Sequence, residues 1–197
     1  IIIERIPATL ELFFLSLIVV CIGGIWAGIY IGMHPKGVFQ KILYAGTTLV
    51  LAIPTFWLGI FLVMLLSVSL PLFPSLGRGE TRSISGGDWG VLTLSGWHAL
   101  VLPVITASMS KTAYVARVIA LHVQQLKQKS FYRFALARGL PRHIILRRYI
   151  LKNLAIPSFS LLPMEAAKLL FHSVVTEVVF SWPGLGVLMV EAVQSHD

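Results

Sequence analysis

Long apolar runs separated by shorter polar segments form the main pattern of the chain. The runs cover approximately residues 12–33, 42–70, 99–121 and 157–180. The first two contain no charged residue, and each is long enough to cross about 30 Å of hydrocarbon at about 1.5 Å per residue. The pattern predicts an all-α, polytopic transmembrane helix bundle that forms one domain over residues 1–197.

Composition supports a membrane protein and indicates its orientation. The chain is 56% hydrophobic and 12% charged, with a net charge of +8 and a mean hydropathy of +0.84. Soluble domains carry roughly twice that share of charge, and in membrane proteins an excess of Lys and Arg collects in cytoplasmic loops rather than marking a nucleic-acid surface. Residues 34–41 and 125–156 are basic, whereas the segment 71–97 is close to neutral. We therefore expect the segment 125–156 to be cytoplasmic and the segment 71–97 extracytoplasmic.

Small and charged residues inside the runs predict helix contacts. Gly24, Gly28 and Gly32 share one helix face, which favours close packing within one subunit over a homodimer seam. Glu165 and Lys168 are three residues apart and are expected to form a structural ion pair. A second acid, Glu177, is compatible with a transport pathway and with a purely structural role.

The pattern of the segment 125–156 predicts two helices joined by a tight turn. Gly139 favours the end of the first helix, because glycine accepts the left-handed conformation that closes helices. Pro141 fits the first turn of the second helix, which we expect to end near Pro157. Phe131, with the residues three and four positions later, forms an apolar face opposite the basic residues. A docking surface and a basic loop lying on anionic lipid both explain this pattern.

This segment resembles the cytoplasmic loop of ABC-importer permeases of the oligopeptide/dipeptide/nickel family. The match rests on Ala135, on Ala-Arg-Gly-Leu at 137–140, on Ile-Leu-Arg-Arg at 145–148, and on Leu151 and Asn153. Arg133 and Phe134 stand where ABC-importer permeases in general have Glu and Ala, and the spacing from Gly139 to Pro157 is longer than in that general pattern. In both respects the segment is similar to the oligopeptide/dipeptide/nickel permeases.

Two further segments resemble the same family and supply candidate site residues. Residues 53–59 match its Pro-x-Phe-x-Leu-Gly pattern, and residues 175–186 match its signature near the end of the fourth run. The resemblance implies a role in coupling to an ATPase for Phe131, Tyr132, Phe134, Ala135, Ala137, Arg138, Gly139 and Leu140. It implies candidates for translocation or gating at Pro54, Phe56, Glu177, Trp182, Pro183 and Gly184.

The resemblance implies a type I ABC-importer permease of the bacterial cytoplasmic membrane, working by alternating access. Its expected partners are a second, homologous permease subunit, two ABC ATPases, an extracytoplasmic binding protein and membrane lipid, with no nucleic acid. The chain has no Gly-x-x-x-x-Gly-Lys-Ser/Thr loop, so ATP and Mg²⁺ are expected on the ATPase and no cofactor, metal site or catalytic residue is expected here.

Cargo and mechanism leave alternatives open. Di- or oligopeptides are the first expectation, and nickel or a metal chelate in the same family is the second. An ion-coupled secondary transporter would account for the charges in the third and fourth runs, but not for the two long motif matches. Because the resembling permeases have a further span on each side, we expect the chain to be truncated at both ends.

Overall fold

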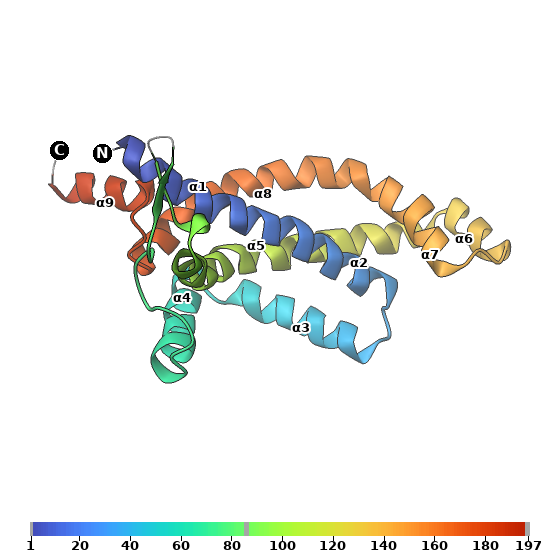
Figure 1. The fold of residues 1–197 in the computed structure, drawn as a ribbon. Helices are drawn as coiled ribbons and strands as arrows, with labels where there is room; N and C mark the ends of the chain where they lie inside the picture. Colours follow the sequence, from blue (N-terminus) through green and yellow to red (C-terminus); the bar gives the residue numbers. More distant parts are fainter. Residues whose placement is uncertain (1, 85–86, 196–197) are drawn as a thin grey trace. The chain divides into compact units, whose positions relative to one another are not determined.

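The computed structural model describes residues 2–84 and 87–195, and almost all of its regular structure is helical (Figure 1). This confirms the predicted all-α class. The helices and strands, in chain order, are α1 (Ile2–Val19), a π-helical turn (Val20–Gly24), α2 (Ile25–Met33), α3 (Val38–Ala52), α4 (Thr55–Val63), a π-helical segment (Met64–Ser69), β1 (Arg82–Ile84), β2 (Gly87–Trp89), a 3-10 turn (Gly90–Leu92), α5 (Leu94–Gln128), α6 (Ser130–Ala137), α7 (Arg142–Ile145), a π-helical turn (Leu146–Ile150), α8 (Leu151–Val179) and α9 (Leu185–Ser195).

Helix length and apolar content identify the candidate membrane spans. In the described part of the chain, three continuous helical stretches qualify, over Ile2–Met33, Leu94–Gln128 and Arg142–Val179. A fourth candidate is the pair Val38–Ala52 and Thr55–Ser69, which a short break separates. Each predicted run therefore contains helix, and three of the helices extend past the predicted ends by several residues.

The break between α3 and α4 lies at Pro54, inside the apolar run predicted over residues 42–70. The Pro54 backbone is extended, with φ −61° and ψ 138°, and its carbonyl accepts a hydrogen bond from the Leu58 N–H at 3.0 Å. Pro54 thus precedes the first turn of α4, a position where its missing N–H has no intrahelical partner. Residues 42–70 are two helices rather than one kinked helix.

Four other prolines lie inside helices of the described structure. Helix α1 continues through Pro7, α5 through Pro103, and α8 through Pro157 and Pro163. The predicted helix end near Pro157 is therefore wrong. Proline removes one N–H donor but keeps a helical φ, and membrane helices tolerate that loss where neighbouring groups satisfy the freed carbonyl.

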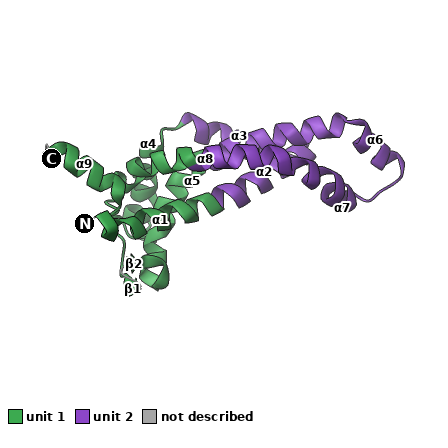
Figure 2. Ribbon diagram, turned by 90° about the horizontal axis from the view of Figure 1, so that it is seen from above, with its two compact units in different colours: residues 1–18, 53–110, 167–197 green, residues 19–52, 111–166 purple. Residues whose placement is uncertain are grey.

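The chain forms two compact units, each with its own apolar core (Figure 2). The first unit comprises residues 1–18, 53–110 and 167–197, and the second comprises residues 19–52 and 111–166. Within the first unit, the core contains Ala8 and Leu12 of α1, Leu100 and Val104 of α5, Leu169 of α8, and Trp182 of the turn after α8. Within the second unit, the buried residues are Val20, Val115, Ile119, Val123, Ile150, Leu154 and Leu161.

The glycine face of α2 packs on α5 inside the second unit, as predicted. A Cβ atom added to Gly28 would lie 2.6 Å from the Ala116 carbonyl oxygen, and one added to Gly32 would lie 2.6 Å from the Val123 Cβ. Atoms do not approach that closely, so the contact of the two helices requires glycine. The stripe therefore serves packing within this subunit.

The segment 71–97, which is expected to be extracytoplasmic, carries a short hairpin. Strands β1 and β2 are antiparallel, with Arg82 opposite Trp89 and Ser83 opposite Asp88. The Ser83 hydroxyl donates to the Asp88 carboxylate across this pair. Earlier in the segment, the Gly77 N–H donates to the Phe180 carbonyl at 3.0 Å, which ties the loop to the C-terminal end of α8.

Candidate functional site

The end of α6 is a tight turn centred on Gly139, in the second unit. The Gly139 N–H donates to the Leu136 carbonyl at 2.9 Å, and the Leu140 N–H donates to the Ala135 carbonyl at 3.2 Å. These two bonds, with φ of +68° at Gly139, are the Schellman arrangement that closes a helix with a left-handed glycine. Pro141 follows in the capping position, directly before α7. The predicted helix stop is confirmed, and the second helix starts one residue later than expected.

The helical residues before the turn divide into buried and exposed side chains. Ala135 is fully buried, while Phe134 and Leu136 are 61% and 50% exposed. The Arg138 guanidinium carbon lies 5.3 Å from the centre of the Phe134 ring, a cation–π contact at the surface. Ala137, Arg138 and Gly139 are also exposed. The turn thus presents apolar side chains together with positive charge.

The predicted single apolar face of α6 is wrong in detail. Phe131 is half-buried and stacks on Tyr149, with ring centres 6.1 Å apart, whereas Phe134 lies on the exposed side. Tyr132 packs against the buried core of the second unit. Phe131, Tyr132 and Ala135 therefore hold α6 in place, and Phe134 with the turn residues is free to contact a partner. We call Phe134, Leu136, Ala137, Arg138 and Gly139 the α6 surface.

A second group of predicted residues surrounds the buried carboxylate of Glu177 in the first unit. Glu177 Oε1 accepts a hydrogen bond from the Thr9 hydroxyl at 2.7 Å. Its Oε2 accepts from the backbone N–H groups of Gly186, at 2.7 Å, and Val187, at 3.3 Å. These N–H groups belong to the first turn of α9, where a negative charge is favourable. Glu177 therefore caps α9 and joins it to α1.

Trp182 and the turn after it complete this network. The fully buried Trp182 ring donates its Nε1–H to the Ala8 carbonyl at 2.9 Å, and the Trp182 N–H donates to the Glu177 carbonyl at 2.8 Å. A Cβ atom added to Gly184 would overlap the Glu177 carboxylate. Pro183, which lies between Trp182 and Gly184 in the chain, is half-buried. The structure thus brings these four gating candidates together as closely packed residues.

Pro54 and Phe56 lie at the start of α4 and take no part in the hydrogen bonds around Glu177. Phe56 is 50% exposed. Further along α4, Gly59 packs closely on Thr106 of α5 and Val179 of α8. The gating candidates thus fall into two sets, one at a helix break and one in a packed network, and their role in gating stays a prediction.

The sequence reasoning missed a buried ion pair between α1 and the segment 71–97. Arg78 Nη2 donates to Glu11 Oε2 at 2.6 Å, and both side chains are largely buried. Glu11 Oε1 also accepts from the Val91 N–H at 3.0 Å, and Arg78 lies over the Trp182 ring at 5.8 Å. The sequence signal that could have indicated this ion pair is Glu11, an acid directly before the long apolar run 12–33. Nothing in the pattern indicated its partner 67 residues away.

Charged residues lie in the predicted third and fourth runs. Arg117 of α5 donates its Nε–H to the Thr47 hydroxyl of α3 at 3.1 Å and lies over the Tyr44 ring. Glu165 is buried and Lys168 is exposed, and their predicted pairing stays a prediction.

The architecture defines a class of protein, an all-α membrane protein with an exposed basic turn between long apolar helices. Comparison with protein families then identifies it further. Residues 24–197 match the family of binding-protein-dependent transport system inner membrane components. The chain belongs to that family and is an inner-membrane protein.

Curated relatives agree with this assignment and carry transport names. The chain is 31% identical to the putrescine export system permease protein SapB of Escherichia coli K12, over 98% of this chain and 65% of that protein. It is 30% identical to the peptide transport system permease protein SapB of Salmonella typhimurium, over 98% of this chain and 65% of that protein. It is also 30% identical to the oligopeptide transport system permease protein AppB of Bacillus subtilis, over 100% of this chain and 60% of that protein. The chain thus spans 60–65% of the length of these relatives.

Proposed function

We propose that this protein is the membrane-spanning permease subunit of an ATP-driven peptide importer. Membership of a family named for binding-protein-dependent transport carries the proposal. The permease itself is not an enzyme, because separate ATPase subunits bind ATP and Mg²⁺ and perform the hydrolysis. The partners are a second permease subunit, two ATPases and an extracytoplasmic binding protein that delivers the cargo.

The α6 surface is the proposed contact with the ATPase. It presents Phe134 and Leu136 as exposed apolar side chains, and an amphipathic helix of this kind fits a groove on a partner. The Schellman bonds at Gly139 fix the end of this helix, and Phe131, Tyr132 and Ala135 anchor it to the second unit. A rigidly held helix can pass a displacement of the ATPase on to the membrane helices.

Alternating access needs a helix bundle with two arrangements whose balance the ATPase contact shifts. We propose the break at Pro54, with Phe56 in the following turn, as a flexible element of the gate. Glu177, Trp182, Pro183 and Gly184 would act on the gate through their fixed packing around the start of α9. The hydrogen bonds of the buried carboxylate support this division.

Peptides are the proposed cargo, since peptide transport is named for the Salmonella and Bacillus relatives. The name of the E. coli K12 relative favours a polyamine as the second candidate and export as its direction. Nickel or a metal chelate, expected from the resemblance as an alternative, has no support from these names.

Uptake into proteoliposomes that contain the complete transporter tests the proposal. Labelled dipeptide should accumulate only with ATP and the binding protein present, and unlabelled dipeptide should compete better than putrescine or Ni²⁺. Accumulation driven by a proton or sodium gradient without ATP would indicate an ion-coupled transporter instead. Competition by putrescine but not by unlabelled dipeptide would indicate a polyamine rather than a peptide as the cargo.

A further inference from the structure

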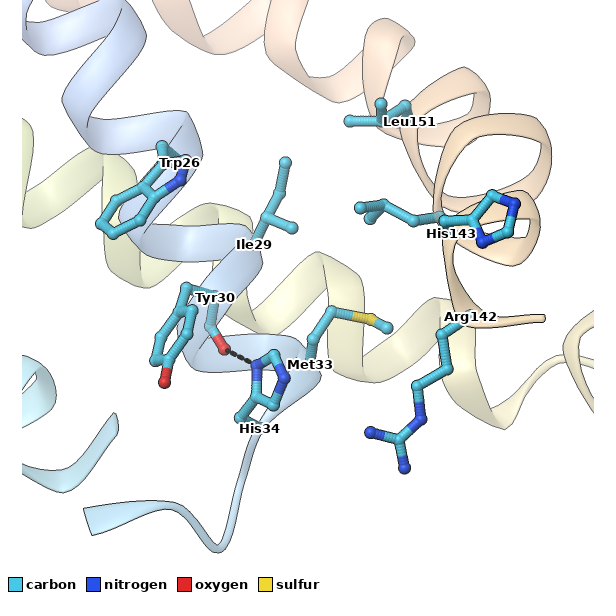
Figure 3. A pocket seen from close by; sticks show the side chains of 9 residues that line it. Trp26, Ile29, Tyr30, Met33, His34, Arg142, His143 and Leu151 are labelled. Carbon is cyan, nitrogen blue, oxygen red and sulfur yellow. Dashed lines mark hydrogen bonds between the residues drawn. The ribbon is translucent and has the colours of Figure 1, made fainter. Parts of the chain in front are cut away.

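Two neighbouring cavities in the second unit share a wall at the C-terminal end of α2. The larger has a volume of about 440 Å³ and lies between α2, α7 and α8. Its lining is mainly apolar, with Trp26, Ile29, Met33 and Leu151 among the side chains (Figure 3). A mainly apolar lining of this kind suits a hydrocarbon chain.

The smaller cavity has a volume of about 230 Å³ and a more polar lining. Lys127 of α5, Tyr132 of α6 and Arg142 of α7 contribute to it. Met33, His34 and Arg142 line both cavities, so the two spaces adjoin. Figure 3 shows Met33 between His34 on one wall and Arg142 on the other.

The charges around the smaller cavity are all positive. Among the residues that line the two cavities in the described structure, none is Asp or Glu. The Lys127 ammonium donates to the carbonyls of Gly32, at 3.2 Å, and Met33, at 3.3 Å, at the end of α2. An ammonium has three N–H donors, and a carbonyl does not neutralise its charge. Lys127 and Arg142 therefore hold two positive charges at one small polar space.

His34 adds a directed polar group to the shared wall. Its Nδ1 faces the Tyr30 carbonyl at 3.2 Å, and the two rings stack with centres 4.6 Å apart (Figure 3). Because a carbonyl only accepts, Nδ1 carries the proton and donates. Nε2 takes no part in this hydrogen bond.

We propose that the second unit binds one anionic phospholipid here, with its phosphate at Lys127 and Arg142 and an acyl chain in the groove along Ile29, Met33 and Leu151. Guanidinium and ammonium groups are the side chains best suited to phosphate oxygens. The adjoining apolar groove selects an amphiphile over a free anion. Basic sites at the cytoplasmic ends of membrane helices attract anionic lipid, and the basic charge pattern places this end of α2 on that side. The inference requires only a membrane protein and is independent of the proposed peptide transport.

Lipid retention by the purified full-length transporter complex tests the site. The complex is incubated with equimolar dioleoyl phosphatidylglycerol and dioleoyl phosphatidylcholine, and native mass spectrometry counts the lipids that stay bound. We expect the wild-type protein to retain phosphatidylglycerol preferentially. Arg142→Gln and Lys127→Gln should each weaken retention about fivefold, the effect of one basic side chain near an anionic lipid.

Two further variants separate the site from general charge. Arg148→Gln removes one exposed arginine of the same loop that lines neither cavity, and it should leave retention unchanged. Leu151→Trp keeps every positive charge but fills the groove, and it should reduce retention.

Several results would overturn the proposal. Equal retention of the two lipids by the wild-type protein is one, and it needs no variant. An equal loss in Arg148→Gln and Arg142→Gln would show an unspecific charge effect. Displacement of phosphatidylglycerol by millimolar inorganic phosphate would show a site for the free anion, without a role for the acyl chain.

Discussion

Gly139 is the residue on which the proposed coupling surface depends most. Its φ of +68° lies in the left-handed region, and a Cβ atom added there would meet nothing within 4 Å. Backbone conformation, rather than lack of space, is therefore what a substitution would change. An ordinary L-residue in that region costs about 1–2 kcal/mol, whereas Asn and Asp occupy it more readily.

We predict that Gly139→Asp inserts into the membrane normally but lowers ATP-driven transport at least about tenfold. A tenfold loss corresponds to about 1.4 kcal/mol less favourable contact between the α6 surface and the ATPase. The new side chain and its negative charge would lie on the α6 surface, beside Phe134 and Arg138. Uptake into proteoliposomes measures the loss. Gly37→Asp adds the same charge to a different loop, at a glycine without positive φ, and should transport normally. Wild-type uptake by Gly139→Asp would contradict the role of the turn.

Glu177 is the buried carboxylate whose partners are best defined. Replacing it by Leu keeps a similar volume but leaves the N–H groups of Gly186 and Val187 and the Thr9 hydroxyl without their acceptor. Unsatisfied buried donors cost about 1–3 kcal/mol each, so Glu177→Leu should lower the unfolding temperature in detergent clearly. Glu80→Leu, at an exposed acid of the same unit, should leave it nearly unchanged. Equal unfolding temperatures for the two variants would show that the cap on α9 does not stabilise the first unit.

Residue-level features were predictable where the signal is local. The helix stop at Gly139 was predicted from the glycine itself and from Pro141, two positions later, and the structure confirms it. The pair of Glu11 and Arg78 was not predictable, because its partners meet only through the fold of the first unit. The same holds for the hydrogen bond between Thr9 and Glu177, which are 168 positions apart.

At the scale of elements, the contact of α2 with α5 depends on backbone proximity. Gly28→Ala would place a methyl group against the Ala116 carbonyl, which cannot move without shifting α5. Gly23 lies on the same stretch, yet its added Cβ would be 3.4 Å from the Thr112 methyl group, an ordinary contact. We predict that Gly28→Ala destabilises the protein by about 1–3 kcal/mol and that Gly23→Ala has little effect. Thermal unfolding in detergent compares them, and a similar shift in both variants would contradict the packing argument.

The prolines show why element boundaries were harder to predict than element types. Pro54 separates two helices, whereas Pro157 and Pro163 lie inside α8. Locally the three residues impose the same constraint, a fixed φ and one missing donor. Whether the helix continues depends on which neighbours satisfy the freed carbonyl, and that depends on the tertiary fold.

At the scale of the whole molecule, composition and periodicity were sufficient for the fold class. The uncharged runs predicted membrane helices, and the basic segments predicted which side faces the cytoplasm. The motif around Gly139 indicated the family, which the match over residues 24–197 shows. A peptide cargo was the first expectation from the sequence, and it stays a proposal, since peptide and polyamine names both occur among relatives of similar identity. The α6 surface needed the structure, because sequence periodicity alone placed Phe131 and Phe134 on one face.

The most direct test of the account asks whether the α6 surface binds the ATPase. The native complex is solubilised and captured through this subunit, and the bound ATPase and its ATP hydrolysis are measured for the wild type, Phe134→Ser and Arg148→Ser. The account predicts an ATPase with the wild type and with Arg148→Ser, and its loss with Phe134→Ser, which removes the most exposed aromatic side chain of the surface. An ATPase bound equally by all three proteins, or none bound by the wild type, would contradict the central claim.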